Sequence, residues 1–128
     1  MQPTKVFVYG TLKKGRGNYD WCIKPYLKQG IDFVQENKIP KGDWRMLSLG
    51  GFPGVVPAID PEQSTEIVGE IFEVTDDAVM RGLDQLEGYP DFYDKAEIVV
   101  GDETVIMYVL DPEEYKEPYY EQVADGVW

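Results

Sequence analysis

Histidine is absent from this 128-residue chain, and its absence excludes several classes of active site. Ser-His-Asp and Cys-His nucleophilic sites, HExxH zinc sites and facial-triad iron sites all need an imidazole. Any acid–base chemistry must therefore come from Glu, Asp, Tyr, Lys or Cys.

Cysteine and positive charge are scarce as well. Cys22 is the only cysteine, so an intramolecular disulfide is excluded and a reducing compartment is compatible. Without histidine to activate it, Cys22 is better interpreted as a buried structural thiol than as a nucleophile. The chain carries 12 Lys and Arg against 24 Asp and Glu, a net charge of -12. Phosphate backbones and anionic lipids do not attract such a surface, so we expect neither a nucleic-acid nor a membrane partner.

Long apolar runs are also missing. No stretch approaches the roughly 18 apolar residues of a membrane span, and the residues before Lys5 have no signal-peptide apolar region. We expect a cytoplasmic protein, with a monomer favoured. The acidic pairs Glu113-Glu114 and Asp76-Asp77 lack the ligand spacing of a calcium loop. We therefore expect no metal and no cofactor.

What the chain does contain is a globular composition rich in aromatic residues. Hydrophobic residues make up 43% and aromatic residues 13% of the sequence. The length fits one domain, residues 1–128, with residues 111–128 as an acidic, Tyr-rich tail. Nine Tyr and three Trp are many for this size, and such residues line small-molecule pockets as well as cores.

Short β-branched and aromatic runs predict about six strands. They cover residues 5–9, 30–37, 44–49, 66–74, 95–100 and 104–110, the last two joined by a tight turn at Gly101-Asp102. The run at residues 55–59 is broken by Pro57, which favours a sheet edge or a loop. Gly69 is a candidate bulge in the strand 66–74.

Two segments have helical character. Residues 75–87 are predicted to form a helix with Thr75 as its N-cap and Gly88 as its stop signal. A shorter helix is expected within residues 19–27, interrupted at Pro25. These elements predict an α+β fold, a small mixed β-barrel or a strongly curved sheet flanked by one or two helices.

Glu87 is the best candidate for acid–base chemistry. Val79, Leu83 and Leu86 recur with the period of a buried helical stripe. Glu87 lies one turn beyond Leu83 and so projects at the edge of that stripe, whereas Asp84 lies away from its centre. Burial and the helix dipole both raise the pKa of an inward-facing carboxyl in a last turn, which suits proton transfer near neutral pH. The alternative is that Glu87 frays into water with the end of the helix.

The turn after the first predicted strand is the second candidate. Tyr9, Gly10, Thr11 and Leu12 present a run of backbone N–H groups, and Gly10 permits a ligand to approach the backbone. Such N–H groups hold carboxylates or developing oxyanions. An ordinary glycine turn explains the same residues.

The segment that follows has the glycine spacing of a phosphate-binding loop. Arg16 and Gly17 stand where that motif needs Lys and Ser or Thr, so a nucleotide site is disfavoured. The cations Lys13, Lys14 and Arg16 either attract an anionic ligand or only decorate the loop.

Four segments, taken in order, resemble the γ-glutamylcyclotransferase-like superfamily, in particular its AIG2-like and γ-glutamylamine cyclotransferase branch. They are VFVYGTLKKGRGN at residues 6–18, FPG at 52–54, VGEIFEV at 68–74, and LDQLEGYP with YDK within 83–95. The resemblance covers most of the chain up to about residue 110, and the tail has no assigned motif.

The resemblance implies a small mixed barrel flanked by helices and a cofactor-independent enzyme. The loop Tyr9–Leu12 would bind the γ-glutamyl group, and Glu87 would be the catalytic acid–base residue. The reaction would release 5-oxoproline and a free amine or amino acid from a γ-glutamyl amide.

Other residues could contribute to such a site. Tyr93 and Tyr108 are candidate pocket walls, although packing explains them as well. Tyr119, Tyr120 and Trp128 of the tail either close over the site or pack. The alternative function is a non-catalytic module that binds a small carboxylate in the same pocket.

Overall fold

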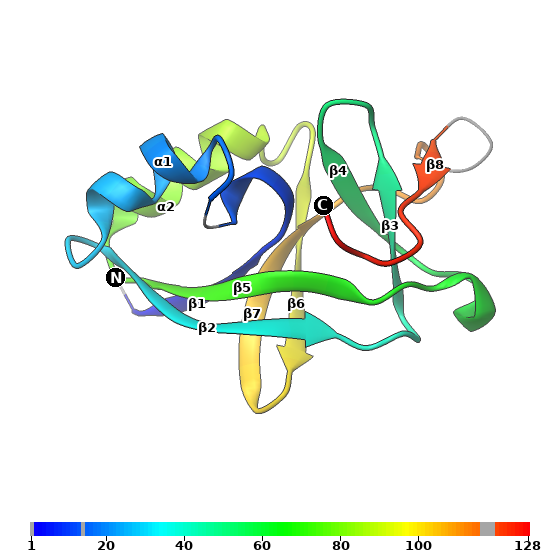
Figure 1. Ribbon diagram of the computed structural model, residues 1–128. Helices are drawn as coiled ribbons and strands as arrows, with labels where there is room; N and C mark the ends of the chain where they lie inside the picture. Colours follow the sequence, from blue (N-terminus) through cyan, green and yellow to red (C-terminus); the bar gives the residue numbers. More distant parts are fainter. Residues whose placement is uncertain (1, 14, 116–119) are drawn as a thin grey trace.

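The middle strand of the larger sheet is β1, Thr4–Val8 (Figure 1). The computed structural model describes residues 2–13, 15–115 and 120–128, and the side chain of Thr11 lies outside this description. The strand order is β2-β5-β1-β7-β6, and β1 runs parallel to β7 and antiparallel to β5. The other strands of this sheet are β2 Ile31–Ile39, β5 Ile67–Val74, β6 Asp94–Val100 and β7 Glu103–Val109.

A smaller sheet stands beside the first, in the order β4-β3-β8. Its strands are β3 Trp44–Ser48, β4 Pro53–Pro57 and β8 Glu121–Gln122. The N–H of Leu110, just after β7, donates to the carbonyl of Val55 at 2.8 Å and joins the two sheets. The described residues form no closed barrel, so the curved-sheet version of the predicted α+β fold is correct. The edge position predicted for the run broken by Pro57 is confirmed by β4.

The helices lie together over one part of the larger sheet (Figure 1). They are α1 Tyr19–Cys22 and α2 Asp77–Glu87, with short 3-10 turns η1 Gly10–Leu12, η2 Lys24–Tyr26 and η3 Pro61–Gln63. The predicted interruption at Pro25 is confirmed, because that proline lies in η2. In the part of the chain that the structure describes, no helix is long and apolar enough to cross a membrane.

The N-cap of α2 is Asp76, and the prediction of Thr75 is wrong. The Asp76 carboxylate accepts hydrogen bonds from the N–H groups of Ala78 at 2.7 Å and Val79 at 3.4 Å. Thr75 is not the cap because its N–H instead donates to Gly30 at 2.8 Å, which keeps it tied to the start of β2. A carboxylate at this end also complements the helix dipole.

The other end of α2 stops at Gly88, as predicted. Gly88 adopts φ 67°, a left-handed conformation that glycine accepts without strain. Its N–H donates to Gln85 at 3.2 Å, and the N–H of Tyr89 donates to Asp84 at 2.9 Å. This pair of bonds is the Schellman pattern, and it makes Glu87 the last helical residue.

Gly69 is not a bulge. It pairs in regular register with Asn37, and the irregularity of this strand pair lies in β2 between Phe33 and Gln35. A Cβ at Gly69 would lie 2.3 Å from the carbonyl oxygen of Val8. Glycine is required here by the close approach of the end of β1, and not by a local kink.

Alternating side chains of β1 divide the core in two. Val6 and Val8 face the cluster that includes Leu83 of α2, whereas Phe7 faces the cluster that includes Met46 of β3. All of these side chains are at most 2% exposed. The strand therefore has both faces covered, and its carboxyl end lies where helix, sheet and hairpin meet.

The acidic tail is attached to both sheets. Gln122 of β8 pairs with Leu47 of β3, and the carbonyl of Gly126 accepts from the N–H of Val68 at 2.9 Å. The described part of the tail is thus mostly irregular, as predicted, but contributes one short strand.

Candidate active site

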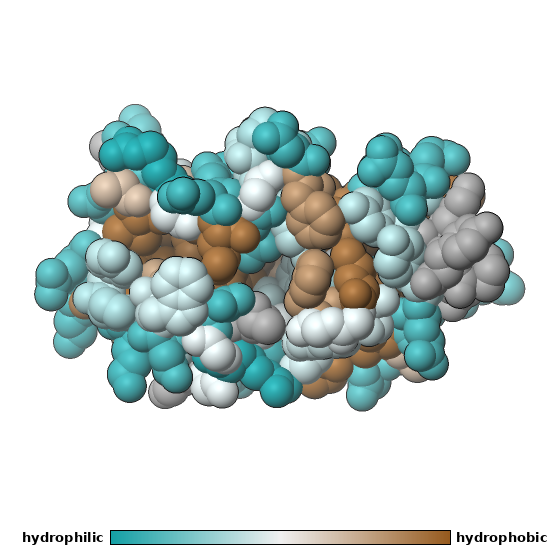
Figure 2. All heavy atoms as spheres, turned by 90° about the horizontal axis from the view of Figure 1, so that it is seen from above, coloured by the Kyte–Doolittle hydropathy of each residue, from teal (hydrophilic) through white to brown (hydrophobic). Residues whose placement is uncertain are grey.

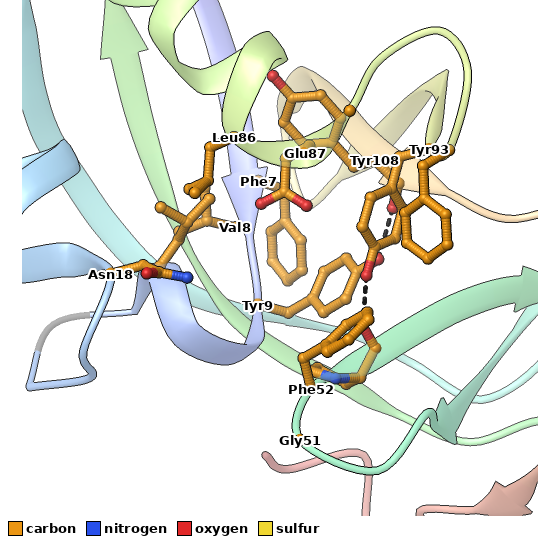
Figure 3. A pocket seen from close by; sticks show the side chains of 14 residues that line it. Phe7, Val8, Tyr9, Asn18, Gly51, Phe52, Leu86, Glu87, Tyr93 and Tyr108 are labelled. Atoms are coloured by element: carbon orange, nitrogen blue, oxygen red, sulfur yellow. Dashed lines mark hydrogen bonds between the residues drawn. The ribbon is translucent and has the colours of Figure 1, made fainter.

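A cavity of about 450 Å³ opens where β1 ends. The end of α2 and the turn between β3 and β4 form its other walls (Figure 3). Seen from above, hydrophobic side chains gather in two patches, one on the side of the helices and one on the side of the β3–β4 hairpin (Figure 2). The described residues that line the cavity are Phe7, Val8, Tyr9, Leu12, Asn18, Gly51, Phe52, Pro53, Leu86, Glu87, Gly88, Phe92, Tyr93 and Tyr108.

Glu87 carries the only carboxyl group among the described lining residues. Figure 3 shows its carboxylate pointing from the end of α2 into the cavity, toward the end of β1. Burial raises the pKa of Glu87 to about 7 from an ordinary value of 4.5. The helical phase explains this position, since Leu83 and Leu86 hold the same side of α2 against the core. Near neutral pH such a carboxyl exists in both protonation states, as proton transfer in both directions requires.

Three tyrosines surround this carboxyl and remain protonated. Burial, which is the largest cause, and the nearby charge of Glu87 both raise the pKa of Tyr9, Tyr93 and Tyr108. Burial and Glu87 likewise raise the pKa of the half-buried Cys22 thiol. The phenols are therefore neutral hydrogen-bond donors over the range in which Glu87 titrates.

The phenol groups of two of these tyrosines fix the cavity walls. Tyr9 donates to the carbonyl of Tyr108 at 2.6 Å and accepts from the N–H of Val55 at 3.3 Å. Tyr93 donates to the carbonyl of Pro53 at 2.6 Å. Tyr93 and Tyr108 thus both line the cavity and pack, since they are 5% and 3% exposed.

Tyr108 is held by a charged network beside the last turn of α2. Its phenol donates to Oδ1 of Asp84 at 2.6 Å, and Nζ of Lys95 lies 2.7 Å from the same oxygen. Sequence reasoning assigned no role to Asp84. The tight turn predicted at residues 101–102 could have indicated that Lys95 lies near Tyr108, because the hairpin register places the two residues directly opposite each other.

The loop after β1 takes a compact 3-10 turn. Gly10 has φ 71°, and the N–H of Lys13 donates back to its carbonyl at 3.2 Å. The first N–H groups of such a turn have no partner within the turn. Tyr9 and Leu12 are in the lining of the cavity, Gly10 packs against Pro53, and the Thr11 side chain lies outside the described residues.

The described Lys and Arg residues of this loop do not line the cavity. Lys13, Arg16 and Lys38 line a separate hollow that also contains the buried Glu70, and Lys14 lies outside the described residues. Arg16 also donates to the backbone carbonyl of Trp128.

The described aromatic residues of the tail lie near the site without lining the cavity. Tyr120 contacts Tyr115 at a ring-centroid distance of 5.3 Å, and Trp128 lies beside Gly10. Tyr119 lies outside the described residues.

Phe52 and Phe92 are among the lining residues that sequence reasoning missed. Phe52 and Phe92 stand in turns that are 40 positions apart, and nothing in either turn indicates the other. Within residues 2–13, 15–115 and 120–128, no group of three or more His, Cys, Asp or Glu is arranged to hold a metal ion.

Comparison with known proteins identifies relatives across nearly the whole chain. Residues 6–128 match the family described as gamma-glutamyl cyclotransferase, AIG2-like. A Methanocaldococcus jannaschii relative, named "Putative gamma-glutamylcyclotransferase", is 34% identical over 96 residues, which are 74% of this chain and 70% of that protein. A Drosophila melanogaster protein with the same description is 35% identical over 115 residues. That match spans 80% of this chain and only 60% of the fly protein.

The fold is also found among solved structures. The crystal structure of an AIG2-like protein from mouse superimposes with a TM-score of 0.69 and 22% sequence identity, covering 100% of this chain and 89% of the mouse chain. At that identity the likeness establishes the fold.

Proposed function

The chain belongs to the γ-glutamyl cyclotransferase, AIG2-like family, and from this premise we propose that it converts a γ-glutamyl amide into 5-oxoproline and a free amine. Glu87 is the proposed acid–base residue. The carbonyl end of the γ-glutamyl group is proposed to lie against the backbone of the loop Tyr9–Leu12. No cofactor takes part in this scheme.

One observation carries the proposal. Among the described lining residues one carboxyl, its pKa raised to about 7 by burial, faces a cavity whose walls are otherwise mostly aromatic and aliphatic. The substrate brings its own nucleophile, the α-amino group, so the protein needs none. Three neutral phenols and the amide of Asn18 complete the polar side chains of the described lining, and none of these is a stronger base than Glu87.

The proton inventory of the reaction fits one carboxylate. Glu87 takes a proton from the α-ammonium, and the freed amine attacks the γ-carbonyl carbon to close a five-membered ring. As the C–N bond to the leaving group breaks, the proton passes to the departing nitrogen. A second proton follows from the ring nitrogen to the same amine, so the products are a neutral lactam and an ammonium ion. The cavity holds the γ-glutamyl group of the substrate in a curled conformation, which brings the reacting atoms together. Such proximity lowers the barrier of a well-oriented ring closure by roughly 7–11 kcal/mol.

The loop Tyr9–Leu12 supplies hydrogen-bond donors for the oxyanion that forms when the amine attacks the γ-carbonyl carbon. The turn η1 presents backbone N–H groups at the end of β1, beside the cavity-lining Tyr9 and Leu12. Fixed donors of this kind stabilise an oxyanion by about 3 kcal/mol each. They cost no reorganisation because Gly10 and Pro53 pack the turn in place.

The test is incubation with a panel of γ-glutamyl amides, with detection of 5-oxoproline. Glu87→Gln keeps the shape of the side chain and removes the base, so we expect kcat to fall about 10²–10⁴-fold. Glu62→Gln, an exposed site on η3, is the matched control and keeps full activity. If Glu87→Gln turns over at the native rate, the acid–base assignment is wrong.

The alternative function, binding of a small carboxylate without turnover, gives a different result. It predicts thermal stabilisation by γ-glutamyl compounds and no 5-oxoproline from any of them. Release of 5-oxoproline by the native protein and not by Glu87→Gln rejects that alternative.

A further inference from the structure

The mouth of the cavity is aromatic. Phe52 in the β3–β4 turn and Phe92 in the turn after α2 both line it, with ring centroids 6.0 Å apart and planes at 63°. Each side chain is 39% exposed, so both keep open apolar surface beside the cavity. We call these two residues the aromatic mouth.

The aromatic mouth is held in place by neighbouring tyrosines. Phe92 contacts Tyr93 edge-to-face at 4.9 Å and Tyr115 at 5.9 Å. Tyr93 is 5% exposed and donates to the carbonyl of Pro53, the residue that follows Phe52. One tyrosine therefore fixes both sides of the mouth, and the exposed ring surface is preorganised.

The charges around the cavity decide which ligand group suits this surface. No Lys or Arg stands among the described lining residues, and Glu87 carries the only carboxyl group there. Lys95 of β6 is paired with Asp84. A carboxylate on the amine side of the substrate would therefore find no counter-charge, and it would repel Glu87.

Under the proposed function the reacting atoms lie beside Glu87, whose carboxylate points toward the end of β1 (Figure 3). The group attached to the amide nitrogen then extends toward the half-exposed rings of Phe52 and Phe92. Two rings set at an angle give edge-to-face and offset contacts to a third ring, the arrangements that aromatic pairs prefer.

We propose that the preferred leaving amine is uncharged apart from its reacting nitrogen, carries no carboxylate, and bears an aromatic ring that packs on Phe52 and Phe92. This inference rests on the proposed function and specifies its substrate class. γ-Glutamyl derivatives of arylalkylamines fit the description, and γ-glutamyl dipeptides do not.

The first experiment compares four γ-glutamyl amides by kcat/KM. They are the benzylamide, the methylamide, the phenylalanine dipeptide and the monoamide of 1,4-diaminobutane. We expect the benzylamide to exceed each of the others by about tenfold or more, as apolar pockets discriminate by this order. A preference for the diaminobutane amide would identify a cation–π site instead, and a preference for the dipeptide would place an unseen counter-charge at the mouth. Either result overturns the proposal.

Substitutions in the aromatic mouth test whether its two rings cause the preference for the benzylamide. Phe52→Ala and, separately, Phe92→Leu should lower the benzylamide-to-methylamide ratio of kcat/KM about tenfold. Phe33→Ala is the matched control, because Phe33 is 49% exposed on β2 and packs on Phe72, away from the cavity. An unchanged ratio in both mouth variants overturns the proposal, and the two substitutions guard against a folding defect in one of them.

A binding measurement separates failure of this inference from failure of the proposed function. The monobenzylamide of glutaric acid lacks the α-amino group and cannot cyclise. If no amide is turned over, the proposed function fails, and calorimetric binding of this compound still tests the mouth. We expect it to bind about tenfold more tightly than the monomethylamide, and to lose that advantage in Phe52→Ala. Equal binding of the two compounds by the native protein overturns the inference.

Discussion

The phenol of Tyr108 donates a 2.6 Å hydrogen bond to Asp84, three residues before Glu87 on α2. Asp84 also accepts from Lys95 at 2.7 Å, and the Lys95 ammonium lies 4.3 Å from the centre of the Tyr89 ring. The network ties the last turn of α2 to the β6–β7 hairpin. It therefore fixes the position of Glu87 relative to the rest of the cavity.

Removing this hydrogen bond should displace the end of the helix. Tyr108→Phe deletes one donor and leaves Asp84 its ion pair, so we expect a loss of about 1 kcal/mol in the free energy of unfolding. We also expect kcat/KM to fall several-fold, since Glu87 is no longer held at one position. Urea denaturation and the 5-oxoproline assay measure the two effects. Tyr26→Phe, at a phenol that is 46% exposed, should change neither quantity; a loss there equal to that of Tyr108→Phe would contradict this role of the network.

The pH dependence of activity should report Glu87. The base must be ionised to accept a proton from the α-ammonium, so kcat/KM should rise with pH and level off above a midpoint of about 7. Burial keeps the tyrosines protonated throughout this range and removes them as alternative causes. The midpoint is read from initial rates with one amide between about pH 5.5 and about pH 8. A rate that is flat over that interval would show that another group moves the proton.

The same carboxyl should make stability depend on pH. Its pKa is raised from 4.5 to about 7 by folding, so the folded state binds the extra proton between these values. The stabilisation is complete below about 4.5 and is lost as the pH rises through about 7. We expect Glu87→Gln to gain about 1–2 kcal/mol over the native protein between about pH 5.5 and about pH 8, after allowance for partial exposure. Parallel stability curves for the two proteins would show that Glu87 is not desolvated.

Local sequence signals predicted the elements that frame the site. The β-branched run before Gly10 indicated the middle strand, Gly101-Asp102 indicated the hairpin, and Gly88 indicated the helix end; the structure confirms all three. Each signal resides in a short local stretch of sequence, so it needs no knowledge of distant contacts. The single-domain organisation, the cytoplasmic location and the monomeric state stay predictions.

The features that sequence did not predict depend on contacts between distant segments. Thr75 and Asp76 are both able to cap a helix, and the bond from Thr75 to Gly30 decides between them. Gly69 looks like a bulge until the crossing of Val8 is known. The aromatic mouth forms only when the β3–β4 turn and the turn after α2 meet at one edge of the cavity. Periodicity and turn preferences contain no information on such meetings.

The glycine of the loop after β1 offers a last prediction, because two separate constraints act on it. Gly10 has φ 71°, and a Cβ there would lie 2.6 Å from Cγ of Pro53. Gly101 shares the first constraint, with φ 61°, but a Cβ there would meet only Asn37 Nδ2 at 3.4 Å. Gly101→Ala should therefore cost about 1–2 kcal/mol in the free energy of unfolding for the left-handed backbone alone. Gly10→Ala should cost at least about 1 kcal/mol more, because the rigid proline ring cannot yield without moving the β3–β4 turn. That movement shifts Pro53, the acceptor of Tyr93, so kcat/KM should fall in Gly10→Ala and stay native in Gly101→Ala. Equal costs for the two variants in urea denaturation would show that backbone strain alone requires glycine at position 10.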